Sequence, residues 1–137
     1  MAAAPLKKIL IADDEPDILE IVGYNLQKEG YEVHTAKNGD EAVDLAKKIK
    51  PDLLILDIMM PKKTGIEVCE ILRAQTAFKE TLIIFLTAMS DEASQISGLE
   101  IGADDYVNKP ISPKVLVSRV NALFRRVSPK EISSVIQ

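Results

Sequence analysis

Short apolar runs and amphipathic segments alternate along the whole chain. The runs Ile9–Ile11, Leu53–Leu56 and Leu82–Leu86 are continuously apolar, as in central strands of a parallel sheet covered on both faces. Alternating apolar residues over 31–35 and the pair Tyr106-Val107 predict two weaker strands. Apolar residues at helical spacing predict five helices, over 18–26, 42–49, 68–72, 93–99 and 116–127.

Several of the expected helices are bounded by residues that commonly mark helix ends. Pro16 suits the first turn of a helix, and the acidic residues before it complement the partial positive charge of a helix N-terminus. Gly30 ends the first helical pattern. Asn38-Gly39 predicts a turn before the second pattern, which Pro51 closes. Five strands that alternate with five helices predict an α/β fold with three layers around a parallel sheet.

The length and composition of the chain favour one acidic domain. A chain of 137 residues suits a single compact core, and we expect residues 1–127 to form it. Residues 128–137 would then begin a linker or a C-terminal tail. The net charge is −4, aromatic residues make up only 4% and Trp is absent. This segment is therefore not expected to bind nucleic acid.

The cysteine content and the shortness of the apolar runs bear on where the protein works. The one cysteine, Cys69, cannot form a disulfide within the chain, which fits a reducing compartment, and its helical context assigns it to packing. Residues 1–5 lack the apolar run of a signal peptide, and no stretch reaches membrane-spanning length. We therefore expect a cytoplasmic protein without a membrane partner.

Polar residues directly follow four of the predicted strands. Their positions are Asp13-Asp14, Asp57, Thr87 and Lys109. Because ligands of open parallel sheets bind outside the carboxyl ends of the strands, we expect these side chains to converge. Three carboxylates in one place repel each other, and Mg²⁺, which prefers oxygen ligands and keeps some waters, would offset that cost. The lysine charge and the threonine hydroxyl complete a predicted pocket for one phosphoryl group.

Each of these residues by itself has an ordinary structural explanation. An Asp pair before a helix is usually a capping feature, and Asp, Thr and Lys-Pro are common where strands end. Only the joint pattern of acid pair, acid, hydroxyl and lysine on four strand ends indicates chemistry. His34 is assigned to a strand surface, and the chain has no Walker-type or dinucleotide-binding glycine motif.

Four segments of the chain resemble the receiver domains of two-component response regulators. They are Ile11-Ala12-Asp13-Asp14-Glu15, Leu56-Asp57-Ile58-Met59-Met60-Pro61 with Gly65, Leu86-Thr87-Ala88, and Gly102-Ala103-Asp104-Asp105-Tyr106 with Lys109-Pro110. The resemblance covers about residues 6–128. It implies a flavodoxin-like (βα)5 sandwich whose five-stranded parallel sheet has the order 2-1-3-4-5. It also implies a cis peptide bond between Lys109 and Pro110.

The resemblance assigns the acidic residues to phosphoryl transfer. Asp57 would be the phosphoacceptor, which takes its phosphoryl group from a sensor histidine kinase or a small phosphodonor. The implied Mg²⁺ ligands are Asp14, Asp57 and the backbone carbonyl of Met59, with Asp13 acting mainly through water. The metal would neutralise charge on the transferring oxygens, which is the main catalytic task in phosphoryl transfer.

The resemblance also implies a switch. Lys109, the Thr87 hydroxyl and the Ala88 N–H would hold the phosphoryl group. Thr87 would move inward to meet it, and Tyr106 would enter the space that Thr87 leaves. Such a protein catalyses only its own phosphorylation and dephosphorylation, so it is expected to be a phosphoacceptor switch and not an enzyme acting on other molecules.

Two methionines occupy positions that flank the acyl phosphate in this family. Met59 stands two residues after Asp57, and Met89 stands two residues after Thr87. Both can be simple gap-filling side chains. Because two apolar side chains cannot orient an attacking water, they also predict a long-lived phosphorylated state.

The C-terminal part resembles the receivers that carry a winged-helix DNA-binding domain. DNA binding is thus expected through an output domain outside this segment, and homodimerisation through the fourth helix, fifth strand and fifth helix. The residues expected on that dimer face are Glu100, Asp105, Arg119 and Arg126. Gln95 and Val115 replace a usual lysine and a usual acid, which predicts an altered but retained dimer because an exposed ion pair contributes only about 0–1 kcal/mol.

Other functions compete with a phosphorylation-activated receiver in a transcriptional regulator. A stand-alone receiver could dock on a partner protein or relay phosphoryl groups. A hydrolase with an aspartyl-phosphate intermediate is disfavoured because Met59 stands where such phosphatases place a second Asp. A pseudo-receiver that binds partners without phosphorylation is disfavoured because every required polar residue is present.

Overall fold

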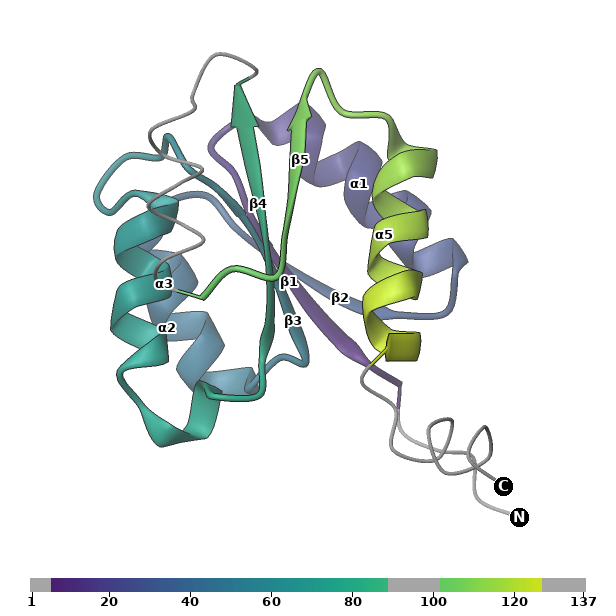
Figure 1. Cartoon of the computed structure of the whole chain (residues 1–137). Coiled ribbons are helices and arrows are strands. Elements are labelled where there is room, and N and C mark those ends of the chain that lie inside the picture. The colour runs from purple at the N-terminus through teal and green to yellow at the C-terminus, as the bar shows by residue number, and fades with distance from the viewer. Residues whose placement is uncertain (1–5, 89–101, 127–137) are drawn as a thin grey trace, which may run out of the picture.

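The structure is a computed structural model that describes residues 6–88 and 102–126. Its elements are β1 (Lys8–Ala12), α1 (Pro16–Lys28), β2 (Glu32–Ala36), α2 (Gly39–Ile49), β3 (Leu53–Asp57), α3 (Gly65–Arg73), a 3₁₀ turn (Thr76–Phe78), β4 (Leu82–Ala88), β5 (Asp105–Lys109) and α5 (Pro113–Arg126) (Figure 1). The helix expected over 93–99 lies outside the described residues. The 3₁₀ turn was not predicted, because three residues are too few to show a periodic pattern.

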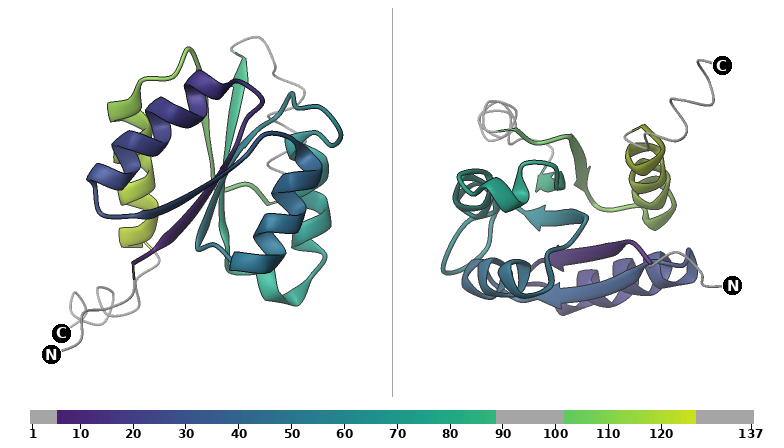
Figure 2. Two further views of the ribbon diagram at one scale, coloured as in Figure 1. Left: turned by 180° about the vertical axis from the view of Figure 1, so that it is seen from behind. Right: turned by 90° about the horizontal axis from the view of Figure 1, so that it is seen from below.

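The five strands form one parallel sheet in the order β2-β1-β3-β4-β5. Helices α1 and α5 cover one face of the sheet, and α2 and α3 cover the other (Figure 1, Figure 2). The predicted flavodoxin-like fold is thus confirmed. The strand order reverses between β1 and β3, because the chain first moves outward to β2 and then returns to the other side of β1. This reversal is the point at which open parallel sheets bind ligands.

The core consists of two layers because successive side chains of a strand point to opposite faces. On β3, Leu54 and Leu56 pack in the layer toward α2 and α3, whereas Leu53 and Ile55 pack in the layer toward α1 and α5. All five residues of β3 are buried. This burial on both faces explains the continuous apolar runs of the central strands. Cys69 is fully buried in the first layer, which confirms its assignment to packing.

Side-chain caps fix the starts of α2 and α3. Asn38 Oδ1 accepts a hydrogen bond from the Glu41 N–H at the start of α2. Asn38-Gly39 therefore begins a helix, and the prediction of a separate turn was wrong, because the short polar side chain serves a cap as readily as a turn. Thr64 and Glu67 form a reciprocal capping box at the start of α3.

Arg73, at the end of α3, connects the segments that precede β4 and β5 at the amino ends of these strands. Its guanidinium donates to the carbonyls of Phe78 and Thr81, at 2.7 Å each, and of Gly102 at 2.9 Å. It also pairs with Asp104 at 3.3 Å, and Asp104 accepts the N–H of Ile83 at 2.8 Å. The chain before β5 is therefore held against β4 by one side chain with a fixed fork of donors.

No helix within residues 6–88 and 102–126 is long and apolar enough to cross a membrane.

Candidate functional site

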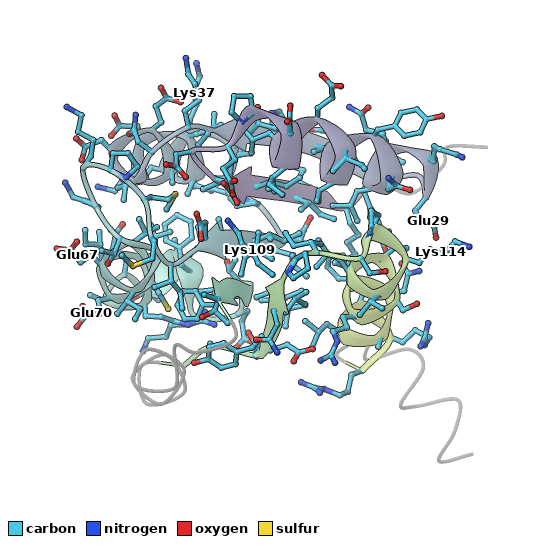
Figure 3. All side chains as sticks on the ribbon, turned by 90° about the horizontal axis from the view of Figure 1, so that it is seen from above. Glu29, Lys37, Glu67, Glu70, Lys109 and Lys114 are labelled. Atoms are coloured by element: carbon cyan, nitrogen blue, oxygen red, sulfur yellow. The ribbon has the colours of Figure 1, made fainter. Side chains whose placement is uncertain are left out.

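The polar residues predicted from the strand ends do converge at one edge of the sheet. Asp13 follows β1 directly, Asp57 ends β3, and Lys109 ends β5 beside Ala88 of β4 in the strand register. Figure 3 looks onto this edge from above and shows Lys109 in the middle of it. Residues 44 or more positions apart in the sequence are adjacent here because parallel strands place all their carboxyl ends on the same side.

Three carboxylates form the centre of the site. Oxygens of Asp13, Asp14 and Asp57 lie within 4.8 Å of each other. Asp13 is fully buried and Asp57 is 4% exposed, whereas Asp14 is exposed. Asp13 Oδ1 accepts the N–H of Glu15 at 2.9 Å. Among the described residues, Asp13 Oδ2 accepts no hydrogen bond with acceptable geometry, although Lys109 Nζ lies 3.2 Å from it.

The donor set fits a hard divalent cation. All three side chains offer carboxylate oxygens, which Mg²⁺ prefers, and the buried Asp13 Oδ2 accepts no hydrogen bond from the part of the chain that the structure describes. The exposed side of the cluster, at Asp14, leaves room for the waters that Mg²⁺ retains. The predicted acidic set of Asp13, Asp14 and Asp57 is thus brought together by the fold.

Lys109 is the cation that the site itself supplies. Its ammonium lies 2.8 Å from Glu15 Oε2, 3.2 Å from Asp13 Oδ2 and 3.4 Å from Asp57 Oδ2. Partial burial works against the charged form, but the hydrogen bond with Glu15 and the charges of Asp57 and Asp13 outweigh it and raise the pKa of Lys109. The lysine therefore stays charged at neutral pH. The Lys109–Pro110 peptide bond is cis, as the family resemblance implied.

The buried acids are shifted toward their neutral forms. Burial, and then the negative charge of Asp13, raise the pKa of Asp57 to about 6, although Lys109 and the Met59 N–H lower it. Burial also raises the pKa of Asp13, against the hydrogen bond from Glu15 and the charge of Lys109. Among the described residues, the carboxylates of this site therefore repel each other more strongly than Lys109 offsets.

Thr87, Ala88 and Tyr106, which form the predicted switch, lie on the neighbouring strands β4 and β5. Thr87 is buried at the end of β4, and its hydroxyl donates to the carbonyl of Ala88 at 3.2 Å. Tyr106, on the neighbouring strand, is half-buried with its ring centroid 5.7 Å from that of Phe85. Met59 places its side chain outward, 69% exposed.

The residues of the predicted dimer face are placed only in part. Arg119 Nη1 contacts both carboxylate oxygens of Asp105 in the same chain, at 2.9 and 3.1 Å. Arg126 is exposed at the end of α5, and Val115 is exposed near its start. Glu100, together with Gln95 and Met89, lies outside the described residues.

Glu15 is a member of the site that the sequence did not identify. It stands at the N-cap of α1, but its side chain makes no capping hydrogen bond and instead accepts from Lys109. The run of acids Asp13-Asp14-Glu15 is the sequence feature that could have pointed to Glu15. The run alone could not show which of the three acids would face Lys109 at the end of β5. His34, by contrast, is half-buried and pairs with Glu32 at 2.7 Å, away from this site.

A groove of about 750 Å³ opens beside Lys109. Its walls come from α1 and from the segment around Pro110, and its lining combines apolar and acidic side chains. The lining residues are Glu15, Asp17, Ile18, Glu20, Ile21, Ala88, Lys109, Pro110 and Ile111. The groove leaves the lysine side of the site open to solvent.

Comparison with known proteins gives consistent matches to one family. The family model described as "Response regulator receiver domain" matches residues 9–121. The alkaline phosphatase synthesis transcriptional regulatory protein PhoP of Bacillus subtilis (strain 168) is 49% identical over 120 residues, which are 88% of this chain and 49% of that protein. The chain thus spans about half the length of this curated relative.

Solved structures agree in fold. A putative response regulator from Chloroflexus aurantiacus has a TM-score of 0.81 at 37% identity, covering 86% of this chain and 97% of that one. The response regulator DrrB, described as a Thermotoga maritima OmpR/PhoB homolog, has a TM-score of 0.79 at 35% identity. That match covers 89% of this chain and 54% of DrrB.

Proposed function

The chain belongs to the response regulator receiver domain family, a family of phosphoacceptor switches, and we propose that Asp57 is its phosphoacceptor. One observation carries this proposal: the Asp57 carboxylate ends β3 between two further acids and a lysine. The acids form an oxygen cluster suited to a divalent cation, and the lysine provides the positive charge that transferring phosphoryl oxygens need.

The proposed reaction is the transfer of one phosphoryl group. A carboxylate oxygen of Asp57 attacks the phosphorus of a phosphohistidine on a sensor kinase. The phosphorus–nitrogen bond breaks, its electron pair leaves with the imidazole nitrogen, and an acyl phosphate forms on Asp57. Lys109 stabilises the negative charge on the transferring oxygens throughout. The chain in this proposal catalyses only its own phosphorylation and dephosphorylation.

Asp13, Asp14 and Asp57 would hold the Mg²⁺ that receiver domains use, with the Met59 carbonyl as a further ligand. When bound, the ion offsets the charge of the carboxylates and of the phosphoryl oxygens. The buried Oδ2 of Asp13 supports this assignment, because it accepts no hydrogen bond from the described residues and shares the charge of Lys109 with Asp57 and Glu15.

The proposed response to phosphorylation starts at Thr87. Its hydroxyl would leave the Ala88 carbonyl and donate to a phosphoryl oxygen, together with the Ala88 N–H. The vacated space would admit Tyr106, which already lies beside Phe85. Phosphorylation would in this way shift the population between two packings of the surface around β5.

Incubation with acetyl phosphate and Mg²⁺, followed by intact-protein mass spectrometry, tests the phosphoacceptor. We expect one phosphoryl adduct on the native chain, none on Asp57→Asn, and a full adduct on the matched surface control Asp44→Asn. An adduct that persists in Asp57→Asn would reject the assignment, and no adduct with any donor would favour a pseudo-receiver.

The activity of a longer parent protein is a separate part of the proposal. We infer a cytoplasmic transcriptional regulator that binds DNA through an output domain, on the basis of the likeness to PhoP.

Phosphorylation would promote a homodimer through the face that carries Asp105 and Arg119, and Arg126 could pair there with Glu100 of a second copy. Since Asp105 and Arg119 pair within one chain, they would have to exchange partners. Sedimentation with and without a phosphoryl mimic tests this, and a strictly monomeric activated chain would contradict it.

A further inference from the structure

Lys109 makes its shortest ion pair with a residue that the phosphoryl chemistry does not require. Its ammonium lies 2.8 Å from Glu15 and 3.4 Å from Asp57. The backbone N–H of Glu15 is fixed by Asp13, and its carboxylate is free of capping duty at the start of α1. Nothing in the helix therefore competes with Lys109 for this carboxylate.

Glu15 also lines the groove that opens beside Lys109. Its side chain is 59% exposed and lines the groove that contains Lys109 and Ala88, next to the two groups proposed to hold the phosphoryl oxygens. The other acids of this groove, Asp17 and Glu20, come from the following turns of α1. Glu15 is the groove acid that contacts the lysine among the described residues.

We propose that Glu15 is a specificity-determining residue that disfavours small dianionic phosphodonors by holding Lys109 in the resting site and by placing negative charge at the groove. This inference rests on the proposed function of Asp57. A dianionic donor meets Coulomb repulsion from Glu15 and finds Lys109 already paired. A protein donor supplies binding energy from its own contacts and can displace the pair. The Glu15–Lys109 ion pair would in this way favour phosphorylation by the kinase over phosphorylation by small donors.

The test compares two small donors of different charge. At pH 7, acetyl phosphate carries about two negative charges and phosphoramidate about one, because phosphate monoanions lose their second proton near pH 6 and the amine of phosphoramidate holds a proton. Rate constants for the adduct are measured by intact mass at saturating Mg²⁺ for the native chain, Glu15→Gln and the groove control Glu20→Gln.

We expect Glu15→Gln to raise the acetyl phosphate rate constant by roughly three- to tenfold and the phosphoramidate rate constant by less, from the charge removed near the site. High salt should shrink the difference between native chain and variant, since Glu15 is exposed and screened. Glu20→Gln should change either rate constant by less than about twofold, because it lacks the contact with Lys109.

A second readout needs no phosphorylation. In the metal-free protein, the ¹⁵N NMR signal of the Lys109 ammonium should shift in Glu15→Gln and stay in place in Glu20→Gln. An unchanged signal, or an unchanged ratio of the two donor rate constants, would overturn the role of Glu15. If the native chain accepts phosphoryl groups on Asp57 while that ratio is unchanged, only this inference fails. If no donor phosphorylates the native chain, the proposed function fails first.

Discussion

The ammonium of Lys109 lies 3.4 Å from the carboxylate of Asp57, yet the pKa of Asp57 is raised to about 6. The lysine lowers the pKa, but burial and the charge of Asp13 together outweigh it. Lys109 is also shared with Glu15 and Asp13, so its charge is not available to Asp57 alone. The ionised acids of this cluster therefore cost stability, and the proposed Mg²⁺ would offset part of that cost.

We predict that Asp57→Asn stabilises the metal-free protein at neutral pH. A folded-state pKa raised from 3.8 to about 6 makes the ionised Asp57 unfavourable by up to about 3 kcal/mol. Below about pH 4, Asp57 is neutral in the folded chain and costs the native protein little stability. This advantage of low pH is lost as the pH rises through about 6 and the folded-state carboxyl ionises. Urea unfolding in EDTA should give a variant 1–3 kcal/mol more stable than the native chain at pH 8, with a roughly constant gap above pH 7.

The gap should narrow toward pH 4, where Asp57 is protonated in the folded chain and only about half ionised in the unfolded one. Asp44→Asn, on the exposed surface of α2, serves as the control for a simple loss of charge. A variant less stable than the native chain at pH 8 would contradict the pKa argument.

Mg²⁺ should stabilise the native chain through the acidic cluster. A ligand at about 100 times its Kd adds about 2.7 kcal/mol to the free energy of unfolding. Asp14→Asn should reduce the Mg²⁺-dependent rise in Tm by more than half while leaving the metal-free Tm nearly unchanged, because Asp14 is exposed. The control Asp17→Asn, on the first turn of α1, should keep the full rise. Equal shifts in both variants would place the ion elsewhere.

Met59→Asn should shorten the lifetime of the acyl phosphate. The native Met59 side chain is exposed two residues after Asp57, the proposed phosphoacceptor, and offers no hydrogen bond to an attacking water. An amide at this position can orient a water for attack on the acyl phosphate. Because correct positioning of a reactant speeds a reaction, we expect hydrolysis to become several-fold faster. Loss of the adduct is followed by mass spectrometry after removal of the donor. A native half-life of seconds, or no change in the variant, would refute the idea.

Gly65→Ala should damage the site, whereas Gly23→Ala should not. A Cβ on Gly65 would lie 2.5 Å from the backbone oxygen of Asp57, which cannot move without displacing the Asp57 side chain. We expect a loss of about 1–3 kcal/mol in stability and a slower phosphorylation rate. On Gly23, the nearest atom would be Val33 Cγ1 at 3.7 Å, so an alanine in mid-helix should add about 0.5–1 kcal/mol. Chemical denaturation and adduct rates measure both variants, and equal effects would contradict the packing argument.

Cys69 should not react with thiol reagents in the folded protein. Burial raises the pKa of its thiol to about 11, and the thiolate is the reactive form. With Ellman's reagent at pH 8, we expect almost no reaction in buffer and one thiol per chain in 6 M guanidinium, a concentration chosen to unfold the protein fully. Rapid labelling under native conditions would show that α3 opens readily.

Several features of the fold could be predicted from local patterns alone. Continuous apolar runs such as Leu53–Leu56 predict buried parallel strands because both faces of a central strand are covered. The strand ends at Asp57, Thr87 and Lys109 predict a shared edge because parallel strands have one direction. The helix cap at Asn38 was mistaken for a turn because the same side chain satisfies either structure.

The sequence by itself therefore determined the layers of the fold and the kinds of groups that meet at its carboxyl edge, since both follow from periodicity and strand direction. Only the tertiary structure decided how those groups share charge. Glu15 and Asp14 are neighbours in the sequence, but the turn into α1 brings Glu15 to Lys109 and leaves Asp14 with the acidic cluster. Distances of a few ångströms and burial decide such pairings, and neither is visible in the order of residues.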